Sequence, residues 1–245
     1  MRNSMNEHHL ILPALRAVLP CHTRQEIVCI GGGRPPAADW LSRLVAKEAE
    51  KTAPIWAIDR GVNICRALQL SPALLIGDGD SADADAWTWA VDQGAKLHSF
   101  PPEKDFTDTE LALHIAAQNL SVPLVILTAA FGGRLDHLMS TATVAAHANI
   151  PCVLADERET LLYLRDGESI HITCEKSPRA ISLLPFTEEC TGVSTKGLYW
   201  ELADAQIGSR TSLAVSNVLA PENSAKTFTV SIGRGVLGVY LCHIE

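Results

Sequence analysis

The sequence lacks the continuous features that mark membrane and nucleic-acid proteins. It has no apolar run of transmembrane length and no run rich in Lys and Arg. The formal net charge is -8, which argues against nucleic acid or an anionic membrane as the main partner. Residues 1–10 are polar and lack the apolar core of a signal peptide. We therefore expect no role on nucleic acid and none in a membrane.

The patterns of a disulfide frame and of a zinc site are also missing. The 7 cysteines are scattered, their number is odd, and no Cys-x-x-Cys pair occurs. Most of them lie in apolar runs, where cysteine behaves as a small hydrophobic residue. We expect reduced thiols and a cytoplasmic protein.

Neither repeats, nor low-complexity stretches, nor long linkers interrupt the 245 residues. Hydrophobic residues make up 47% and charged residues 20% of the chain, so it can bury a substantial core in one large domain or two ordinary ones. Residues 1–26 form an extension whose role the sequence does not indicate, and residues 10–19 have the pattern of a short amphipathic helix.

Apolar strand-like runs alternate with helical stretches between residues 27 and 157. The strands are expected at 27–30, 55–58, 73–76, 95–100, 123–127 and 152–155, with helices between them. Thr107 and Glu110 form a capping box for a helix over 108–119. This alternation predicts an α/β domain over 27–157, with a parallel sheet and helices on both faces.

Helical periodicity disappears from about residue 158. Short strands are expected at 160–164, 169–173, 180–184, 198–202, 212–215, 227–232 and 236–241. Several short strands at this spacing predict an all-β sandwich domain over 158–245.

Polar residues follow the predicted parallel strands, at the edge where α/β sheets bind ligands. They are Gly31–Gly33, Asp59, Asp78, Asp80, Lys104, Asp105, Thr107, Asp108, Gly132, Gly133, Arg134 and Asp136. Each alone has a structural explanation, such as a helix N-cap for Asp59 or a solvated turn for Asp78 and Asp80. Their convergence from four strand ends is better explained by a site for a metal ion and a polyphosphate.

The hypothesis of a metal site rests on Asp78 and Asp80. Two carboxylates this close repel each other, and a hard divalent cation such as Mg²⁺ relieves the repulsion. Lys104 and Arg134 would take the remaining phosphate charge. The run Gly31–Gly33 lacks the spacing of a dinucleotide fingerprint or a P-loop, so a tight turn and a close approach to a ligand both remain open.

Three motifs in this order resemble the thiamine pyrophosphokinase family. Gly77–Ser81 matches Gly-Asp-x-Asp-Ser, Lys104–Asp108 matches Lys-Asp-x-Thr-Asp, and Gly132–His137 matches Gly-Gly-Arg-x-Asp-His. Further matches are Asp59–Gly61 and, in the C-terminal part, Ile181–Leu183, Gly192-Val193, Gly197-Leu198 and Ser216-Asn217. Gly79 and Arg60 depart from the family pattern, and Gly79 predicts a more mobile metal loop.

The resemblance implies that 27–157 is a Rossmann-like nucleotide-binding catalytic domain and that 158–245 is a β-sandwich thiamine-binding domain. It also implies a homodimer that transfers pyrophosphate from ATP to thiamine, giving thiamine diphosphate and AMP. By similarity, Mg²⁺ is held by Asp78, Asp80 and Asp105. The catalytic set would add Asp108 and Arg134 to these three. Substrate contacts would come from Asp59, Lys104, Thr107, Asp136 and, across the dimer, Ser216 and Asn217.

Other interpretations stay open on the residues alone. The chain could be a pyrophosphokinase for another alcohol, such as a hydroxymethyl pterin, or a non-enzymatic nucleotide-binding protein on this fold. Trp200 is either an aromatic partner for the thiamine ring or a core residue. His137 is expected to pack or hydrogen-bond near the site. The number of metal ions and the identity of any general base are left open.

Overall fold

A computed structural model describes residues 7–46, 53–98 and 106–244 of the chain. Its internal contacts divide the chain into two compact units. The first, called here the α/β unit, is Thr23–Asp156. The second, the β unit, joins the chain up to His22 with the chain from Glu157 onward.

The α/β unit is built on a parallel sheet. Its strands are β3 (Gln25–Ile30), β4 (Ile55–Ile58), β5 (Leu74–Ile76), β6 (Lys96–His98), β7 (Pro123–Thr128) and β8 (Cys152–Ala155), in the order β8-β7-β3-β4-β5-β6. Every residue of β4, β5, β7 and β8 is buried, while β6 is exposed at the edge. Continuous Val, Ile and Leu runs are typical of strands covered on both faces.

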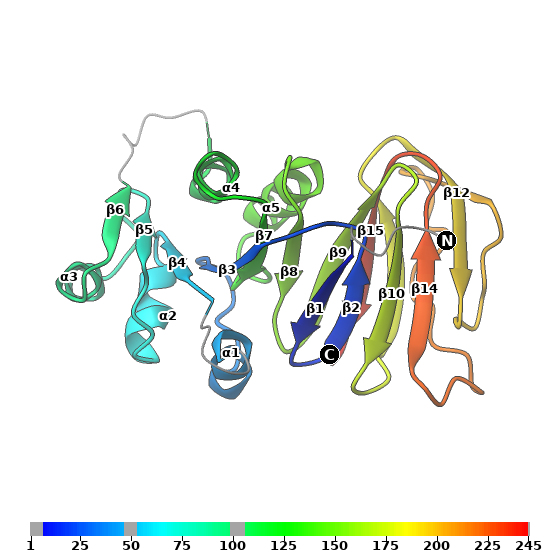
Figure 1. The fold of residues 1–245 in the computed structure, drawn as a ribbon, viewed down its shortest axis with the longest axis horizontal. Coiled ribbons are helices and arrows are strands. Elements are labelled where there is room, and N and C mark those ends of the chain that lie inside the picture. The colour runs from blue at the N-terminus through cyan, green and yellow to red at the C-terminus, as the bar shows by residue number, and fades with distance from the viewer. Residues whose placement is uncertain (1–6, 47–52, 99–105, 245) are drawn as a thin grey trace. The chain divides into compact units, whose positions relative to one another are not determined.

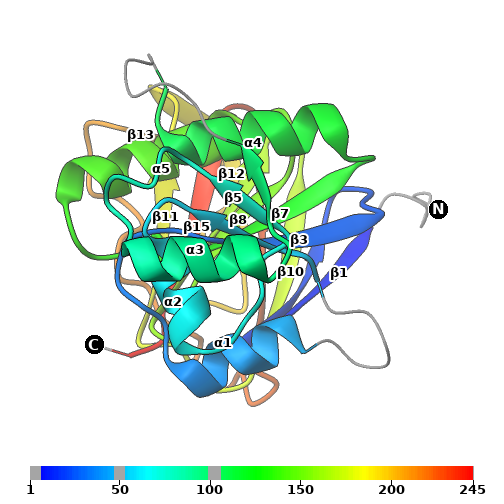
Figure 2. The same ribbon diagram turned by 90° about the vertical axis from the view of Figure 1, so that its left-hand side faces the viewer.

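Helices flank this sheet on two sides (Figures 1 and 2). They are α1 (Ala38–Val45), α2 (Gly61–Ala67), α3 (Ala84–Asp92), α4 (Asp108–Asn119) and α5 (Leu135–His147). Figure 2 shows α4 and α5 on one side and α1, α2 and α3 on the other. Thr107 caps α4 as predicted, because its hydroxyl accepts from the main-chain N–H of Glu110 at 3.2 Å.

The order of the strands places a crevice between β3 and β7. β3 is the first of these strands along the chain, and it lies between β4 and β7 in the sheet. The chain runs from β3 to β4, β5 and β6 on one side, and then crosses back to β7 and β8 on the other side. At such a switch point the loops after the two strands diverge, and ligands bind between them. The residues after β3 and β7 are therefore the ones that the fold offers to a ligand.

The β unit consists of antiparallel strands. They are β1 (His8–Leu12), β2 (Leu15–Leu19), β9 (Glu159–Arg165), β10 (Ser169–Cys174), β11 (Ala180–Pro185), β12 (Glu189–Lys196), β13 (Ala205–Gly208), β14 (Thr227–Ser231) and β15 (Val236–Cys242). One set pairs in the order β1-β2-β10-β14-β12-β13, and another in the order β11-β15-β9. Within the described ranges, no helix is long and apolar enough to cross a membrane.

The prediction of an amphipathic helix over residues 10–19 is wrong. This stretch forms the hairpin of β1 and β2, and β2 pairs with β10. Leu10, Leu12 and Leu15 are buried while Ile11 is exposed, which is the two-residue alternation of a half-buried strand. Residues set apart as an N-terminal extension therefore contribute two strands to the β unit.

Two other expected strands are absent where the sequence placed them. Residues 198–202 and 212–215 lie outside any strand, and β12 and β13 occur at ranges that were not predicted. β12 passes through Gly192 with a register shift between Cys190 and Val193. A bulge of this kind accommodates a glycine with a φ of 68° inside a strand.

Candidate active site

Three carboxylates meet where β4 and β5 end. Ile58 lies opposite Ile76 in the parallel register, so the residues that follow each strand are brought together. One ligand oxygen from each of Asp59, Asp78 and Asp80 lies within 4.8 Å of the other two. Charge repulsion from Asp78, together with a hydrogen bond from it, raises the pKa of the Asp80 carboxyl.

Asp59 is positioned by its neighbours more tightly than the other two. Its main-chain N–H donates to Ile76 O at 2.8 Å, and the hydroxyl of Ser81 donates to its Oδ2 at 2.5 Å. The other oxygen, Oδ1, is buried without a hydrogen-bond partner. A buried carboxylate oxygen needs a donor or a cation, and a set of carboxylate oxygens suits Mg²⁺. The residues present therefore fit a divalent cation.

The loop between Asp78 and Asp80 is closely packed. Gly79 has a φ of 76°, and a Cβ added to it would lie 3.1 Å from the indole ring of Trp87. A Cβ on Gly77, which has a φ of 128°, would lie 3.5 Å from Oδ1 of Asp108. The glycine at position 79 thus has a packing reason that the sequence did not indicate, and Asp108 faces the same loop.

A cavity of about 340 Å³ lies beside this cluster, at the switch point between β3 and β7. Its lining includes Gly31–Gly33, Asp59, Arg60, Ser81, Thr107–Thr109, Thr128–Ala130, Gly132–Arg134, His137 and Thr141. Four of the predicted site residues, Asp59, Thr107, Asp108 and Arg134, therefore border one space, together with His137, which was expected near the site. Asp59 belongs both to the cavity wall and to the carboxylate cluster.

The glycine run Gly31–Gly33 lies very close to other atoms of the protein, namely main-chain atoms at the end of β7 and in the loop after it. Gly31 N–H donates to Thr128 O at 2.9 Å, and Gly33 N–H donates to Ala129 O at 2.6 Å. A Cβ on Gly33 would lie 2.6 Å from the carbonyl oxygens of Ala129 and Phe131. These glycines let the loop after β3 pack directly on the loop after β7, so both loops can line the cavity with main chain.

Arg134 and Asp136 form an exposed two-point ion pair at the start of α5. Arg134 Nε donates to Oδ1 of Asp136 at 3.1 Å, and an Nη donates to Oδ2 at 2.5 Å. This pairing raises the pKa of Arg134 and lowers that of Asp136. The main-chain N–H of His137 also donates to Asp136 Oδ1, at 3.0 Å. With the guanidinium 73% exposed, the pair can open toward a phosphate at little cost.

Some predicted residues lie elsewhere. Lys104 and Asp105 are outside the described residues. Ser216 and Asn217 belong to the β unit, where Ser216 is exposed with a φ of 61° and Asn217 is 7% exposed. Trp200 is 59% exposed, and its ring meets the ring of Tyr199 edge to face, with the ring centroids 4.7 Å apart. Trp200 is thus a surface residue and not a core residue.

The side-chain amide of Asn217 is hydrogen-bonded to main-chain groups. Its Nδ2 donates to Trp200 O at 2.7 Å, and its Oδ1 accepts from Trp200 N–H at 3.2 Å and from Val218 N–H at 2.9 Å. An amide has few further hydrogen-bonding positions after these three. In the β unit, Asn217 therefore fixes the segment that exposes the ring of Trp200.

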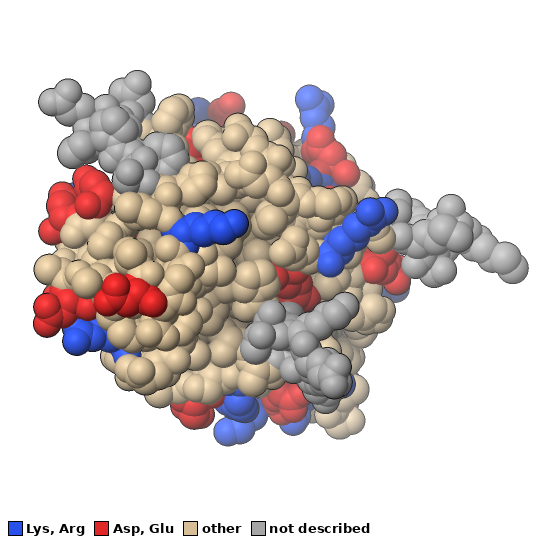
Figure 3. All heavy atoms as spheres, turned by 60° about the vertical axis from the view of Figure 1, so that its left-hand side comes forward, with Lys and Arg blue, Asp and Glu red and all other residues tan. Residues whose placement is uncertain are grey.

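Charged side chains lie in small groups on the face drawn in Figure 3. Asp and Glu form several groups there, and some Lys and Arg side chains stand alone while others lie beside acidic ones. A ligand with phosphates would therefore meet local positive groups such as Arg134, and not a continuous basic surface.

Two site residues had no role assigned from the sequence. Ser81 is the last residue of the Gly77–Ser81 motif, and Trp87 lies on α3. Their contacts, to Asp59 and to Gly79, join residues that are 22 and 8 positions apart. The place of Ser81 directly after two aspartates is the signal that could have marked it as a hydrogen-bond partner for a carboxylate.

Comparison with known proteins gives the same result along most of the chain. Residues 45–154 match the family model described as thiamin pyrophosphokinase, catalytic domain. Residues 169–237 match the model described as thiamin pyrophosphokinase, vitamin B1 binding domain. A thiamine pyrophosphokinase of Bacillus subtilis is 27% identical over 187 residues, which are 75% of this chain and 85% of that relative.

Solved structures share the fold at low identity. A thiamine pyrophosphokinase structure from Bacillus subtilis has a TM-score of 0.75 at 20% identity and covers 90% of this chain and 100% of its own. One from Geobacillus thermodenitrificans has a TM-score of 0.74 at 22% identity, with 90% and 99% covered. Because both family models match in the expected order around the site described above, this chain belongs to the thiamine pyrophosphokinase family of enzymes.

Proposed function

We propose that this chain transfers the pyrophosphoryl group of ATP to the hydroxyl group of thiamine, giving thiamine diphosphate and AMP. The observation that carries the proposal is the carboxylate cluster of Asp59, Asp78 and Asp80 beside a glycine-lined cavity, in a chain of this family. We take the parallel sheet to be Rossmann-like and the antiparallel strands to form a β-sandwich.

The proposed metal is Mg²⁺, held by Asp78, Asp80 and Asp105, with Asp59 as a further ligand. The donor set supports a hard cation, since it offers carboxylate oxygens and a buried Oδ1 of Asp59 without a partner. When bound, Mg²⁺ would offset negative charge on the phosphate oxygens. Ser81 would hold Asp59 in place through its hydroxyl.

The cavity residues would bind and orient the triphosphate. The loops after β3 and β7 present main chain and little side-chain bulk, which suits close contact with phosphate oxygens. Arg134 can give up its exposed pair with Asp136 and turn its planar fork to a phosphate. Lys104 would add a second positive charge. Thr107, Asp108 and Asp136 would complete the substrate contacts near the start of α4 and α5.

The chemical step exchanges one P–O bond for another. The hydroxyl oxygen of thiamine attacks the β-phosphorus, the bond from that phosphorus to the α,β-bridging oxygen breaks, and AMP departs with that oxygen. The hydroxyl proton passes to a carboxylate of the site or to water. Thiamine is a cation, so the carboxylates favour its binding as well. Positioning of the two reactants supplies most of the rate enhancement in reactions of this type.

We further propose a homodimer in which the β unit of one subunit serves the site of the other. The exposed ring of Trp200 is the proposed aromatic partner of thiamine, with Ser216 as a contact and Asn217 fixing the segment. The cysteines within the described residues are free thiols, which supports a cytoplasmic location.

The test is a coupled assay for AMP with purified chain, Mg²⁺, ATP and thiamine. We expect AMP only when thiamine is present and its loss when EDTA removes the metal. A parallel reaction with a hydroxymethyl pterin in place of thiamine should give no AMP. AMP from the pterin and none from thiamine would overturn the assignment of the substrate.

A further inference from the structure

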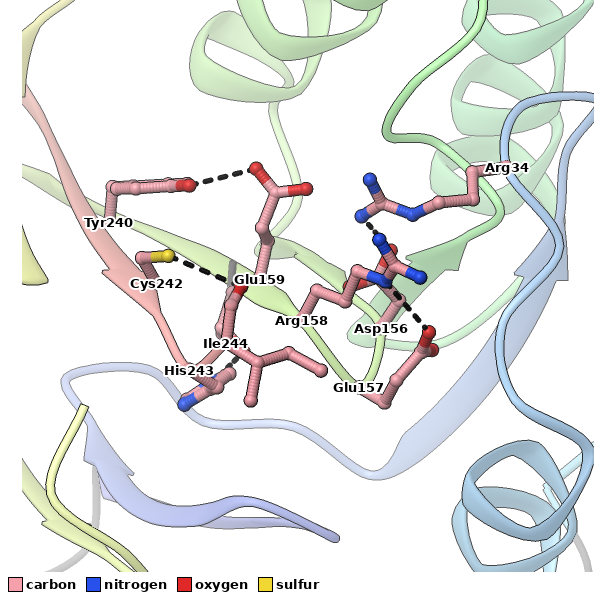
Figure 4. A network of polar contacts seen from close by, with 10 residues as sticks. Arg34, Asp156, Glu157, Arg158, Glu159, Tyr240, Cys242, His243 and Ile244 are labelled. Atoms are coloured by element: carbon pink, nitrogen blue, oxygen red, sulfur yellow. Dashed lines mark hydrogen bonds and ion pairs between the residues drawn. The ribbon is translucent and has the colours of Figure 1, made fainter. Parts of the chain in front are cut away.

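The side chain of Arg34 crosses the ends of three neighbouring strands. Arg34 directly follows the glycine run after β3, and its main-chain N–H donates to Phe131 O, in the loop after β7, at 2.7 Å. Its guanidinium donates to Oδ2 of Asp156, the residue after β8, at 2.6 Å. Figure 4 shows the side chain extended toward Asp156. Because the strand order is β8-β7-β3, one residue links three strand ends.

This pair is much less exposed than the pair of Arg134 and Asp136, and its carboxylate is fully buried. The side chain of Asp156 is 0% exposed and that of Arg34 is 27% exposed, whereas Arg134 and Asp136 are 73% and 62% exposed. A buried ion pair is not in general more stable than well-packed apolar residues of the same size. Its presence at the end of three strands therefore points to a role in fixing geometry.

The geometry in question is that of the two loops that line the cavity. A Cβ on Gly132 would lie 2.9 Å from Cβ of Arg34, and a Cβ on Gly33 would lie 2.6 Å from two carbonyl oxygens of the opposite loop. Only glycine therefore fits at positions 33 and 132, and the two loops pack closely on each other and on the side chain of Arg34. We expect a shift of Arg34 to move both glycines, and both border the cavity.

We propose that Arg34 and Asp156 are positioning residues that lock the loops after β3 and β7 together and so set the affinity of the cavity for the phosphates of the nucleotide. This inference rests on the proposed function, because it takes the cavity as the nucleotide site. Arg34 acts through Gly33 and Gly132 and does not touch the substrate. We therefore expect loss of this pair to weaken nucleotide binding and to leave thiamine binding unchanged.

The test compares Asp156→Asn, Arg34→Lys and the double variant with the unmodified chain. Calorimetric titration with Mg²⁺-ATP should give a Kd raised roughly tenfold in Asp156→Asn, since small misplacements of binding groups have effects of this size or larger. The KM for ATP should rise by the same factor, with kcat within about twofold and the KM for thiamine unchanged. The double variant should be no worse than Asp156→Asn, because the two residues act as one unit.

Asp39→Asn is the matched control, since it breaks an exposed pair with Arg43 on α1 in the same unit. It should leave Kd and both KM values unchanged. For the case in which Asp156→Asn does not fold, Arg34→Ala is titrated with and without about 20 mM guanidinium, which should restore part of the lost affinity by filling the vacated place beside Asp156.

Three outcomes would overturn the inference, two from the asparagine variant or the kinetics and one from the rescue experiment. One is a folded Asp156→Asn with the unmodified Kd for Mg²⁺-ATP, and another is an equal rise in both KM values. An Arg34→Ala variant whose affinity guanidinium does not restore would also count against it. If the unmodified chain itself fails to bind Mg²⁺-ATP, the proposed function fails, and the inference fails with it.

Discussion

The hydroxyl of Ser81 donates to Oδ2 of Asp59 at 2.5 Å, and this contact joins the loop after β5 to the end of β4. It leaves the buried Oδ1 of Asp59 as the oxygen that can face a cation shared with Asp78 and Asp80. The orientation of one proposed metal ligand is therefore held by a residue that need not touch the metal.

Ser81→Ala should weaken metal binding more than it weakens folding. Loss of a partner of this kind costs roughly 10- to 100-fold in metal affinity. The measurement is the Mg²⁺ concentration that gives half-maximal turnover, supported by Mn²⁺ binding followed by electron paramagnetic resonance. Ser81→Thr keeps the hydroxyl and should stay close to the unmodified chain. As a control outside the site, Thr88→Ala removes a hydroxyl that donates to Ala84 O on α3. A Ser81→Ala variant with unchanged Mg²⁺ dependence would contradict this role.

Asp78→Asn should abolish turnover and leave the fold intact or slightly more stable. The pKa of Asp80 is raised first by the charge of Asp78, so the metal-free fold gains stability as the pH falls through that raised pKa. Removing the charge of Asp78 should bring the same relief at neutral pH. Urea unfolding in EDTA measures this, with Asp85→Asn on α3 as an exposed control. Turnover that survives Asp78→Asn would remove Asp78 from the metal ligands.

Asn217→Ala should affect both stability and thiamine binding, whereas Ser216→Ala should affect thiamine binding with little change in stability. Three hydrogen bonds join the amide of Asn217 to main chain, so we expect Asn217→Ala to lower the free energy of unfolding of the β unit by about 2 kcal/mol. It should also raise the KM for thiamine, because the segment of Trp200 loses its support. Ser216→Ala should raise the KM for thiamine with little change in unfolding. Equal stability of the two variants in denaturant titration would show that Asn217 is not structural.

Stability of the β unit should depend on pH through His243. Burial lowers the pKa of His243 from 6.5 to about 4, and its Nε2 lies 2.9 Å from the hydroxyl of Thr160. Figure 4 places this histidine on the C-terminal segment that also carries Tyr240, whose hydroxyl donates to Glu159 at 2.8 Å. Between pH 6.5 and about 4 the unfolded chain binds a proton that the folded chain does not, so stability falls as the pH falls through this window.

The loss should approach about 3 kcal/mol at the acid end, from a shift of this size at 1.36 kcal/mol for each pH unit. Chemical unfolding from pH 7 to pH 4 measures it, and His243→Gln should flatten the profile over that range. His9→Gln, at an exposed histidine of the same unit, is the control and should leave the slope as it is. A steep profile that persists in His243→Gln would assign the acid sensitivity to other groups.

Local signals predicted the places of the parallel strands. β3, β4, β5 and β8 are short apolar runs followed directly by glycine or aspartate, so the place and the polar end of each are both visible in the sequence. The boundaries of α4 and β8 agree with the prediction at both ends. Their position after the strands singled out Asp78, Asp80 and Arg134 as residues to examine, and the family motifs include the same three.

What the sequence could not supply are relationships between distant segments. Arg34 and Asp156 are 122 positions apart, and no local pattern marks either as the partner of the other. The hairpin of β1 and β2 was misread because leucines at positions 10, 12, 15 and 19 suit a helix face nearly as well as alternating strand positions. Pairing with β10 decides between the two, and pairing is a property of the folded chain.

The central claim, transfer of a pyrophosphoryl group to thiamine, is tested most directly by phosphorus NMR of the complete reaction. The unmodified chain is incubated with Mg²⁺, ATP and thiamine until the signals stop changing. The account predicts that AMP and thiamine diphosphate form in equal amounts, because attack at the β-phosphorus moves two phosphoryl units together. Formation of ADP and thiamine monophosphate would contradict it, since those products require attack at the γ-phosphorus.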